Sequence, residues 1–148
     1  MNNSPRNSLD FSSTGLEEFS SDSLLEVMQE KTEDESASKY VLIKHDFYSS
    51  DSDHGREILA DFISRLCDSS YKSIIIYLID KGTLLLDKSN PLFGDILQLI
   101  QKAETVIADQ ESIDFYGMDI ISNSKILIQP AGSIAEELIY LSDILTLE

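Results

Sequence analysis

The sequence is poor in cysteine and proline, with one cysteine (Cys67), three prolines and no tryptophan in 148 residues. A single cysteine cannot form an internal disulfide, and there is no CxxC motif. The longest apolar run, IIIYLI, is far too short to span a bilayer. The first residues, MNNSPRNSLDFSS, lack the apolar core of a signal peptide. We therefore expect a protein of the reducing cytoplasm with no membrane segment.

Basic residues are also scarce. Eleven Lys and Arg stand against 27 Asp and Glu, which gives a formal net charge of -16. A surface of this sign repels nucleic-acid phosphates and anionic lipid headgroups, and no basic stripe interrupts it. The charge excludes nucleic-acid and membrane binding as expected functions and is sufficient to explain solubility.

Residues 1–38 differ in composition from the rest of the chain. They are rich in serine and acidic residues and have only two aromatics, Phe11 and Phe19. Such a segment buries too little apolar surface to offset chain entropy, which predicts a disordered acidic tail. The run SLLEVMQEK within it has capping-box spacing between Ser23 and Glu26. It is either a transient helix or a docking motif for a protein partner.

From Tyr40 onward, apolar strand patterns alternate with helical patterns. The strand-like runs are YVLIKHD, SIIIYLI, TVIAD, KILIQ and DILTL. Helical spacing of apolar residues predicts helices within 52–70, 89–104 and 133–142. The second is expected to begin at Ser89, Asn90 and Pro91, and the third at a capping box formed by Ser133 and Glu136.

This alternation predicts an α/β fold with three layers, in which helices cover both faces of a mostly parallel five-stranded sheet. The run SIIIYLI is continuously apolar, as expected for a strand buried on both faces. One domain over residues 39–148, following the tail, accounts for the chain.

Ligands of open parallel sheets bind beyond the carboxyl ends of the strands, which singles out three segments. The first contains Asp46 among histidines and acids, but its spacing matches no metal-binding motif, and a cap of the next helix at residues 51–53 explains it better. We expect no metal and no cofactor. In the second segment, Lys81 could meet an anion, although the simpler interpretation is a turn at Gly82, followed by leucines (Leu84, Leu85 and Leu86) that cover the sheet or a subunit interface.

The third segment, ADQESIDFYGM, offers several polar groups after strand three. Its carboxylates could serve as acid and base, but only in a pocket that separates their pKa values. The alternative is a solvated helix start, capped by Asp109 or Ser112, with Phe115 and Tyr116 packed inward. The candidate ligand-binding residues are Asp46, Asp109, Gln110, Glu111, Ser112 and Tyr116.

Four segments carry a resemblance to a known family: IDFYGM, REILADFISRL, SIIIYLIDKGTLLL and NPLFGDILQLIQKAETVIA. Together they make residues 40–147 resemble the DsrE-like family, most closely the C-terminal domain of YedF-type proteins linked to selenium and sulfur metabolism. The resemblance implies a DsrE-like domain over 39–148 that forms a homo-oligomer, a trimer or a hexamer.

The chain departs from this family where its chemistry is placed. The family typically carries Cys-Gly-Thr-Cys before the tyrosine-glycine run, whereas this sequence has Asp109, Gln110, Glu111 and Ser112. YedF-type proteins also usually have an N-terminal TusA-like domain with a Cys-Pro motif. In this sequence the serine-rich tail takes the place of that domain. A persulfide relay needs a thiolate, which a serine hydroxyl cannot replace.

The sequence therefore predicts no catalytic residues and a non-catalytic binding or assembly module, although whether the chain is an enzyme stays open. The alternative is a sulfurtransferase-like protein that uses Cys67 as its sulfur acceptor. Cys67 lies near a helix C-terminus beside Asp68, and both features disfavour a thiolate. Two further possibilities are a small-molecule pocket built around Phe115 and Tyr116 and a regulator that acts through its acidic tail.

Overall fold

The computed structural model describes residues 38–148, so the predicted disordered tail and its short helix lie outside the described residues. Five strands and four α-helices alternate along the described part. The strands are β1 (Ser38–Ile43), β2 (Ser73–Leu78), β3 (Thr105–Asp109), β4 (Ile126–Gln129) and β5 (Ile144–Leu147). The helices are α2 (Asp53–Cys67), the 3-10 helix η1 (Asp80–Leu86), α3 (Phe93–Lys102), α4 (Gln110–Tyr116) and α5 (Ala131–Ile139).

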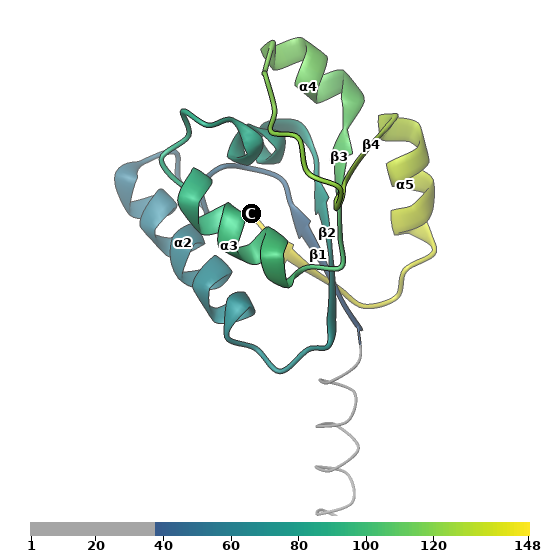
Figure 1. The fold of residues 1–148 in the computed structure, drawn as a ribbon, viewed down its shortest axis with the longest axis horizontal. Helices are drawn as coiled ribbons and strands as arrows, with labels where there is room; N and C mark the ends of the chain where they lie inside the picture. Colours follow the sequence, from purple (N-terminus) through teal and green to yellow (C-terminus); the bar gives the residue numbers. More distant parts are fainter. Residues whose placement is uncertain (1–37) are drawn as a thin grey trace, which may run out of the picture. The chain divides into compact units, whose positions relative to one another are not determined.

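The five strands form one sheet in the order β4-β3-β2-β1-β5, and every pair is parallel. From β1 to β4, each strand is added next to the one before it, in one direction across the sheet. The chain then crosses back, and β5 pairs with the other edge of β1. Because parallel crossovers are right-handed, this reversal puts α5 on the face opposite α2 and α3. Figure 1 shows these layers, with α5 alone on its side. The predicted three-layer α/β/α class is confirmed.

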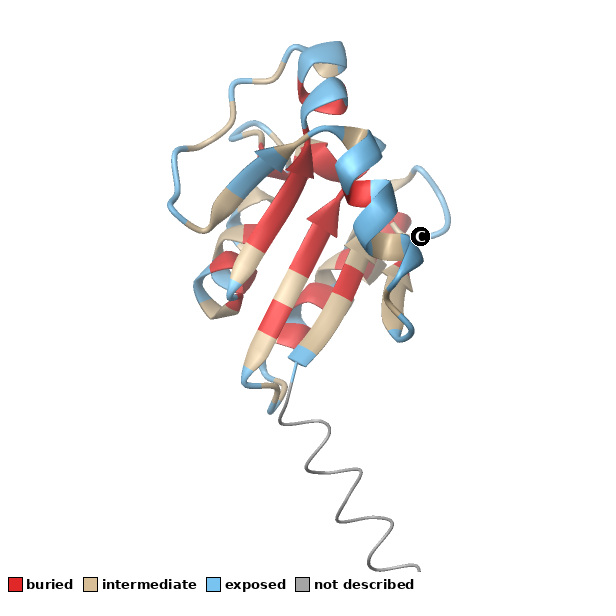
Figure 2. Ribbon diagram, turned by 90° about the vertical axis from the view of Figure 1, so that its right-hand side faces the viewer, coloured by how far each residue is buried: buried red, intermediate tan, exposed pale blue. Residues whose placement is uncertain are grey.

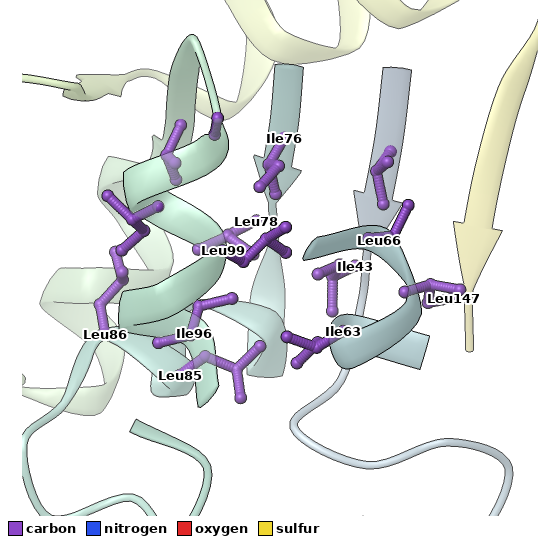
Figure 3. Packing of buried hydrophobic residues seen from close by; sticks show 14 of the residues in the cluster. Ile43, Ile63, Leu66, Ile76, Leu78, Leu85, Leu86, Ile96, Leu99 and Leu147 are labelled. Atoms are coloured by element: carbon purple, nitrogen blue, oxygen red, sulfur yellow. The ribbon is translucent and has the colours of Figure 1, made fainter. Parts of the chain in front are cut away.

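The larger core lies between the sheet and the α2–α3 layer, and Figure 3 shows part of its packing. Each helix contributes a stripe of buried aliphatic side chains at helical spacing, as the sequence predicts. The stripes are Leu59, Ile63 and Leu66 on α2 and Ile96, Leu99 and Ile100 on α3. In η1, Leu85 and Leu86 are fully buried in the same cluster, which confirms that this segment covers the sheet.

Gly82 lets η1 lie against the end of β1. A Cβ atom built on Gly82 would be 2.1 Å from the carbonyl oxygen of Ile43, which is backbone and cannot move aside cheaply. The glycine therefore serves close approach of two backbones. It brings the segment that follows β2 next to the carboxyl end of β1.

The opposite face of the sheet has a thinner cover. Its small buried cluster contains Tyr77, Ile107 and Ile134, and residues around it, among them Tyr40 and Ile75, are only half-buried. Figure 2 shows this face with β2 and β3 beside α5. Five large apolar side chains are exposed in the described residues: Phe115, Leu127, Ile128, Ile139 and Tyr140.

Two helices begin away from their predicted starts. α3 begins at Phe93, because Asn90 accepts a hydrogen bond from the Leu92 N–H in a turn that precedes the helix. α5 begins at Ala131 with Pro130 as its N-cap residue, so the predicted capping box of Ser133 and Glu136 is wrong. In contrast, Ser52 caps α2 by accepting from the Gly55 N–H at 3.0 Å, within the predicted range. No helix in residues 38–148 is long and apolar enough to cross a membrane.

Candidate functional site

Two acidic residues lie at the carboxyl ends of β2 and β3. β2 and β3 are hydrogen-bonded neighbours, so Asp80, two residues after the end of β2, and Asp109, at the end of β3, lie at the same edge of the sheet. The Asp80 N–H approaches Asp109 Oδ2 at 3.5 Å. This edge is where parallel sheets bind their ligands.

Asp109 ends the strand and starts α4 at once. Its Oδ1 accepts from the Ser112 N–H at 3.2 Å, and its Oδ2 accepts from the Ser112 hydroxyl at 2.5 Å. Asp109 is therefore the N-cap residue of α4, as one of the two predicted alternatives has it. Both side chains are buried, with Asp109 only 6% exposed.

These contacts fix the charge state of Asp109. Burial of the carboxyl acts to raise its pKa. Hydrogen bonds from the Ser112 hydroxyl, the Ser112 N–H and the Asp80 N–H act to lower the pKa, and together they outweigh burial. The net effect places the Asp109 pKa below its ordinary value. Asp109 is thus an ionised acceptor at neutral pH, which makes it unsuited to the role of a general acid.

Asp80 is held in an unusual backbone conformation. Its φ is +49°, a left-handed value that aspartate tolerates better than most residues. The Tyr116 hydroxyl donates to Asp80 Oδ1 at 2.7 Å, which ties the end of α4 back to the end of β2. The hydrogen bond to this carboxylate raises the pKa of Tyr116 to about 12, so the phenol stays protonated as a donor.

The other predicted site residues lie around this pair in different settings. Glu111 Oε1 accepts from the Ala131 N–H at 2.8 Å and so caps the start of α5 from another helix. Gln110 is exposed and donates to Asp114 at 2.9 Å. Asp46 is half-buried and accepts from the Asn90 amide at 3.1 Å. The structure therefore brings Asp109 and Ser112 together, whereas Gln110 and Asp46 make separate contacts.

A cavity of about 270 Å³ opens beside Asp80 and Asp109. Five of its seven lining residues are apolar, and four come from α5, which lies over the ends of β2 and β3. The lining is Ile79, Asp80, Asp109, Ala131, Ile134, Ala135 and Leu138. A cavity with mainly apolar walls and a few polar groups is the usual form of a small-molecule site.

Sequence reasoning missed Asp80 and the α5 wall of this cavity. Asp80 could have been found, because it lies two residues after a strand whose carboxyl end faces the predicted site. The α5 residues give no such signal, since Ile134 and Leu138 look like any apolar helix stripe. Phe115, predicted to pack inward, is 82% exposed, because Ile113 takes the buried position of this short helix.

Cys67 lies far from this edge of the sheet. It is the last residue of α2, which runs back along the sheet, so it is at the amino end of the strands, and it is half-buried. Burial raises the pKa of its thiol and Asp68 adds to this, although Lys102 acts in the opposite direction. Within residues 38–148, no three His, Cys, Asp or Glu side chains are grouped as metal ligands would be.

The cap at Asp109 gives a stability prediction. Asp109→Ala should lower the free energy of unfolding by about 1 kcal/mol at neutral pH, because Ala cannot accept the capping hydrogen bonds, whereas Asp109→Asn should lose less. Because the folded-state pKa of Asp109 is depressed, its ionic contribution is present above the unfolded-state pKa and is lost as the pH falls through the folded value. The stability advantage of the native chain over Asp109→Asn should therefore shrink in acid. Urea unfolding of both variants between pH 7 and pH 3 measures this, and an advantage that grew in acid would contradict it.

Comparisons with known proteins bear on the fold. No protein-family profile matches the chain, and no curated protein matches its sequence. Several solved structures resemble it, and three of them are each similar over 74% of the chain. The conserved protein of unknown function BT1422 from Bacteroides thetaiotaomicron is 22% identical, with a TM-score of 0.53 over 95% of its length. MTH1491 from Methanobacterium thermoautotrophicum, also of unknown function, is 15% identical, with a TM-score of 0.54 over 98% of its length.

The third, the YchN protein of E. coli, is 12% identical, with a TM-score of 0.50 over 99% of its length. At these identities the likeness concerns the fold alone. All three have DsrE-like folds, and the described part of this chain therefore has a DsrE-like fold.

Proposed function

We propose that the chain is a non-catalytic binding or assembly module related to the YedF-type proteins of sulfur and selenium metabolism. The observation that carries this proposal is the state of the β3 tip, where the resemblance expects the first cysteine of the family. The Asp109 carboxylate stands there, ionised and engaged as the cap of α4. A persulfide carrier needs a free thiolate at this position.

The neighbouring positions support the same proposal. The Ser112 hydroxyl, at the second expected sulfur position, is buried and donates to Asp109. Glu111 between them accepts from the start of α5. Asp109, Glu111 and Ser112 thus make hydrogen bonds that stabilise helix starts, at the positions where the family would place its sulfur chemistry. Any thiol introduced among these carboxylates would have a raised pKa and little thiolate.

Assembly into a homo-oligomer, a trimer or a hexamer, is part of the proposal. The exposed apolar side chains Leu127 and Ile128 lie on β4, an edge strand of the sheet. Leu127 is in register with Ile107, which belongs to the thinly covered face. Ile139 and Tyr140, at the end of α5, add further apolar surface to the described part. Exposed apolar groups of this size favour burial against another chain. The acidic tail is a second route to a protein partner.

A sulfur-handling protein that uses Cys67 is the rival proposal. The half-exposed position of Cys67 and the nearby Lys102 favour it, whereas the net rise of the thiol pKa opposes it. The two proposals differ in whether one residue carries sulfur.

Sulfur transfer separates these proposals. The full chain, treated with a small-molecule persulfide donor, should pass no sulfur to a thiol acceptor, because the thiol of Cys67 is mostly protonated at neutral pH. Intact-mass spectrometry detects a sulfur adduct of about 32 Da on the protein, and a colorimetric assay follows transfer. Cys67→Ser is the control. Turnover by the native chain that disappears in Cys67→Ser would decide for the rival.

Oligomeric state tests the assembly part. Size-exclusion chromatography with light scattering should give three or six times the chain mass of 16.6 kDa. Leu127→Glu should shift the protein toward the monomer, since a charge would be desolvated at the apolar face. Lys88→Glu, which places the same residue at an exposed polar position, should leave the mass unchanged. A native chain that stays monomeric at high concentration would overturn this part.

A further inference from the structure

The cavity beside Asp80 and Asp109 combines an aliphatic wall with two acidic groups. Ala131 and Ala135 are small, and they leave space between α5 and the sheet that larger side chains would fill. Ile134, Leu138 and Ile79 provide the rest of the apolar wall. The space amounts to about 270 Å³, the liquid volume of roughly nine water molecules.

Neither carboxylate of the cavity is neutralised by a cation within residues 38–148. The ion pairs of this part of the chain join Lys44 to Glu148, and Arg56 to Asp51 and Asp53. Among the described residues, Asp80 and Asp109 receive hydrogen bonds from neutral donors alone: Tyr116, Ser112 and the backbone. The lining of this apolar space therefore contains one buried acidic residue, Asp109, and one exposed acidic residue, Asp80.

A third acceptor lies next to this pair. Gln129 ends β4 in register with Asp109, so it lies on the same face of the sheet. Its Oε1 is buried and has no hydrogen-bond partner within the part of the chain that the structure describes. Buried acceptors are normally satisfied, so this oxygen is available to an N–H donor.

We propose that this cavity binds a small organic cation, an alkylammonium group with its aliphatic chain against α5 and its N–H groups toward Asp80 and Asp109. An ammonium supplies the positive charge that the carboxylates lack and up to three N–H donors, and the aliphatic wall takes the hydrocarbon part. A volume of about 270 Å³ accommodates a short alkyl chain with its ammonium group. The inference rests on the proposed function, since it names the ligand class of a module that carries no sulfur.

The test is a titration of the full chain with n-hexylammonium, 1-hexanol and hexanoate, three probes with the same hydrocarbon chain but different charge. Calorimetry gives the affinities, and methyl NMR signals of Ile134 and Leu138 report whether the probe enters the cavity. The ammonium should bind more tightly than the alcohol, and hexanoate should bind least.

Two variants keep the local structure while removing charge. Asp109→Asn retains a good N-cap, and Asp80→Asn retains a residue that tolerates positive φ. Each should weaken hexylammonium binding by about tenfold and leave hexanol binding unchanged. Asp61→Asn, an exposed position on α2, removes the same charge at the opposite face and should change neither affinity.

The outcomes separate this inference from the proposal beneath it. Four results would each overturn the cation site and leave the proposed sulfur-free module unaffected. They are equal binding of the ammonium and the alcohol, tighter binding of hexanoate, absence of all binding, and an equal effect of Asp61→Asn. Sulfur turnover through Cys67 would overturn the module, whereas charge-selective binding at the cavity would still establish the site.

Discussion

The hydrogen bonds between the Asp109 carboxylate and Ser112 stabilise the part of the molecule on which its proposed function depends. They stop β3, start α4 and fix a negative charge at the edge of the sheet. A carboxylate that caps a helix is stabilised in its ionised form, and a residue occupied in this way offers neither a proton nor a nucleophile. The same contacts therefore stabilise the local fold and, under the proposed function, leave no group at this position for the sulfur chemistry that the family resemblance suggests.

The order of the strands explains why a cavity lies beside this cap. Because the chain returns from β4 to β5 across the whole sheet, one helix of nine residues covers the face opposite α2 and α3. The start of α5 is held over the ends of β2 and β3 by Glu111 from α4. A short helix with alanines at its start leaves both a hollow at one end and apolar surface elsewhere. The proposed ligand site and the proposed assembly surface would thus have a common structural origin.

The parallel sheet, the helix stripes and the cap at Asp109 could be read from the sequence because each depends on local pattern. The start of α5 could not: the Ala131 N–H is capped by Glu111, twenty positions earlier, so a tertiary contact replaces the local box that Ser133 and Glu136 suggest. The role of Asp80 depends on its backbone φ and on Tyr116, neither of which leaves a periodic signal. The exposure of Phe115 depends on which side of a two-turn helix packs against the protein. The apolar character of a residue alone does not predict that side.

The ionisation of Asp109 is the most direct test of this account. The carboxyl carbon of Asp109, followed by NMR in a selectively labelled chain as the pH is lowered, reports its pKa in the folded protein. We expect a midpoint below the ordinary aspartate value of about 3.9, because three hydrogen bonds stabilise the charged form. A midpoint well above that value would show a protonated, reactive carboxyl at the tip of β3 and would contradict the account.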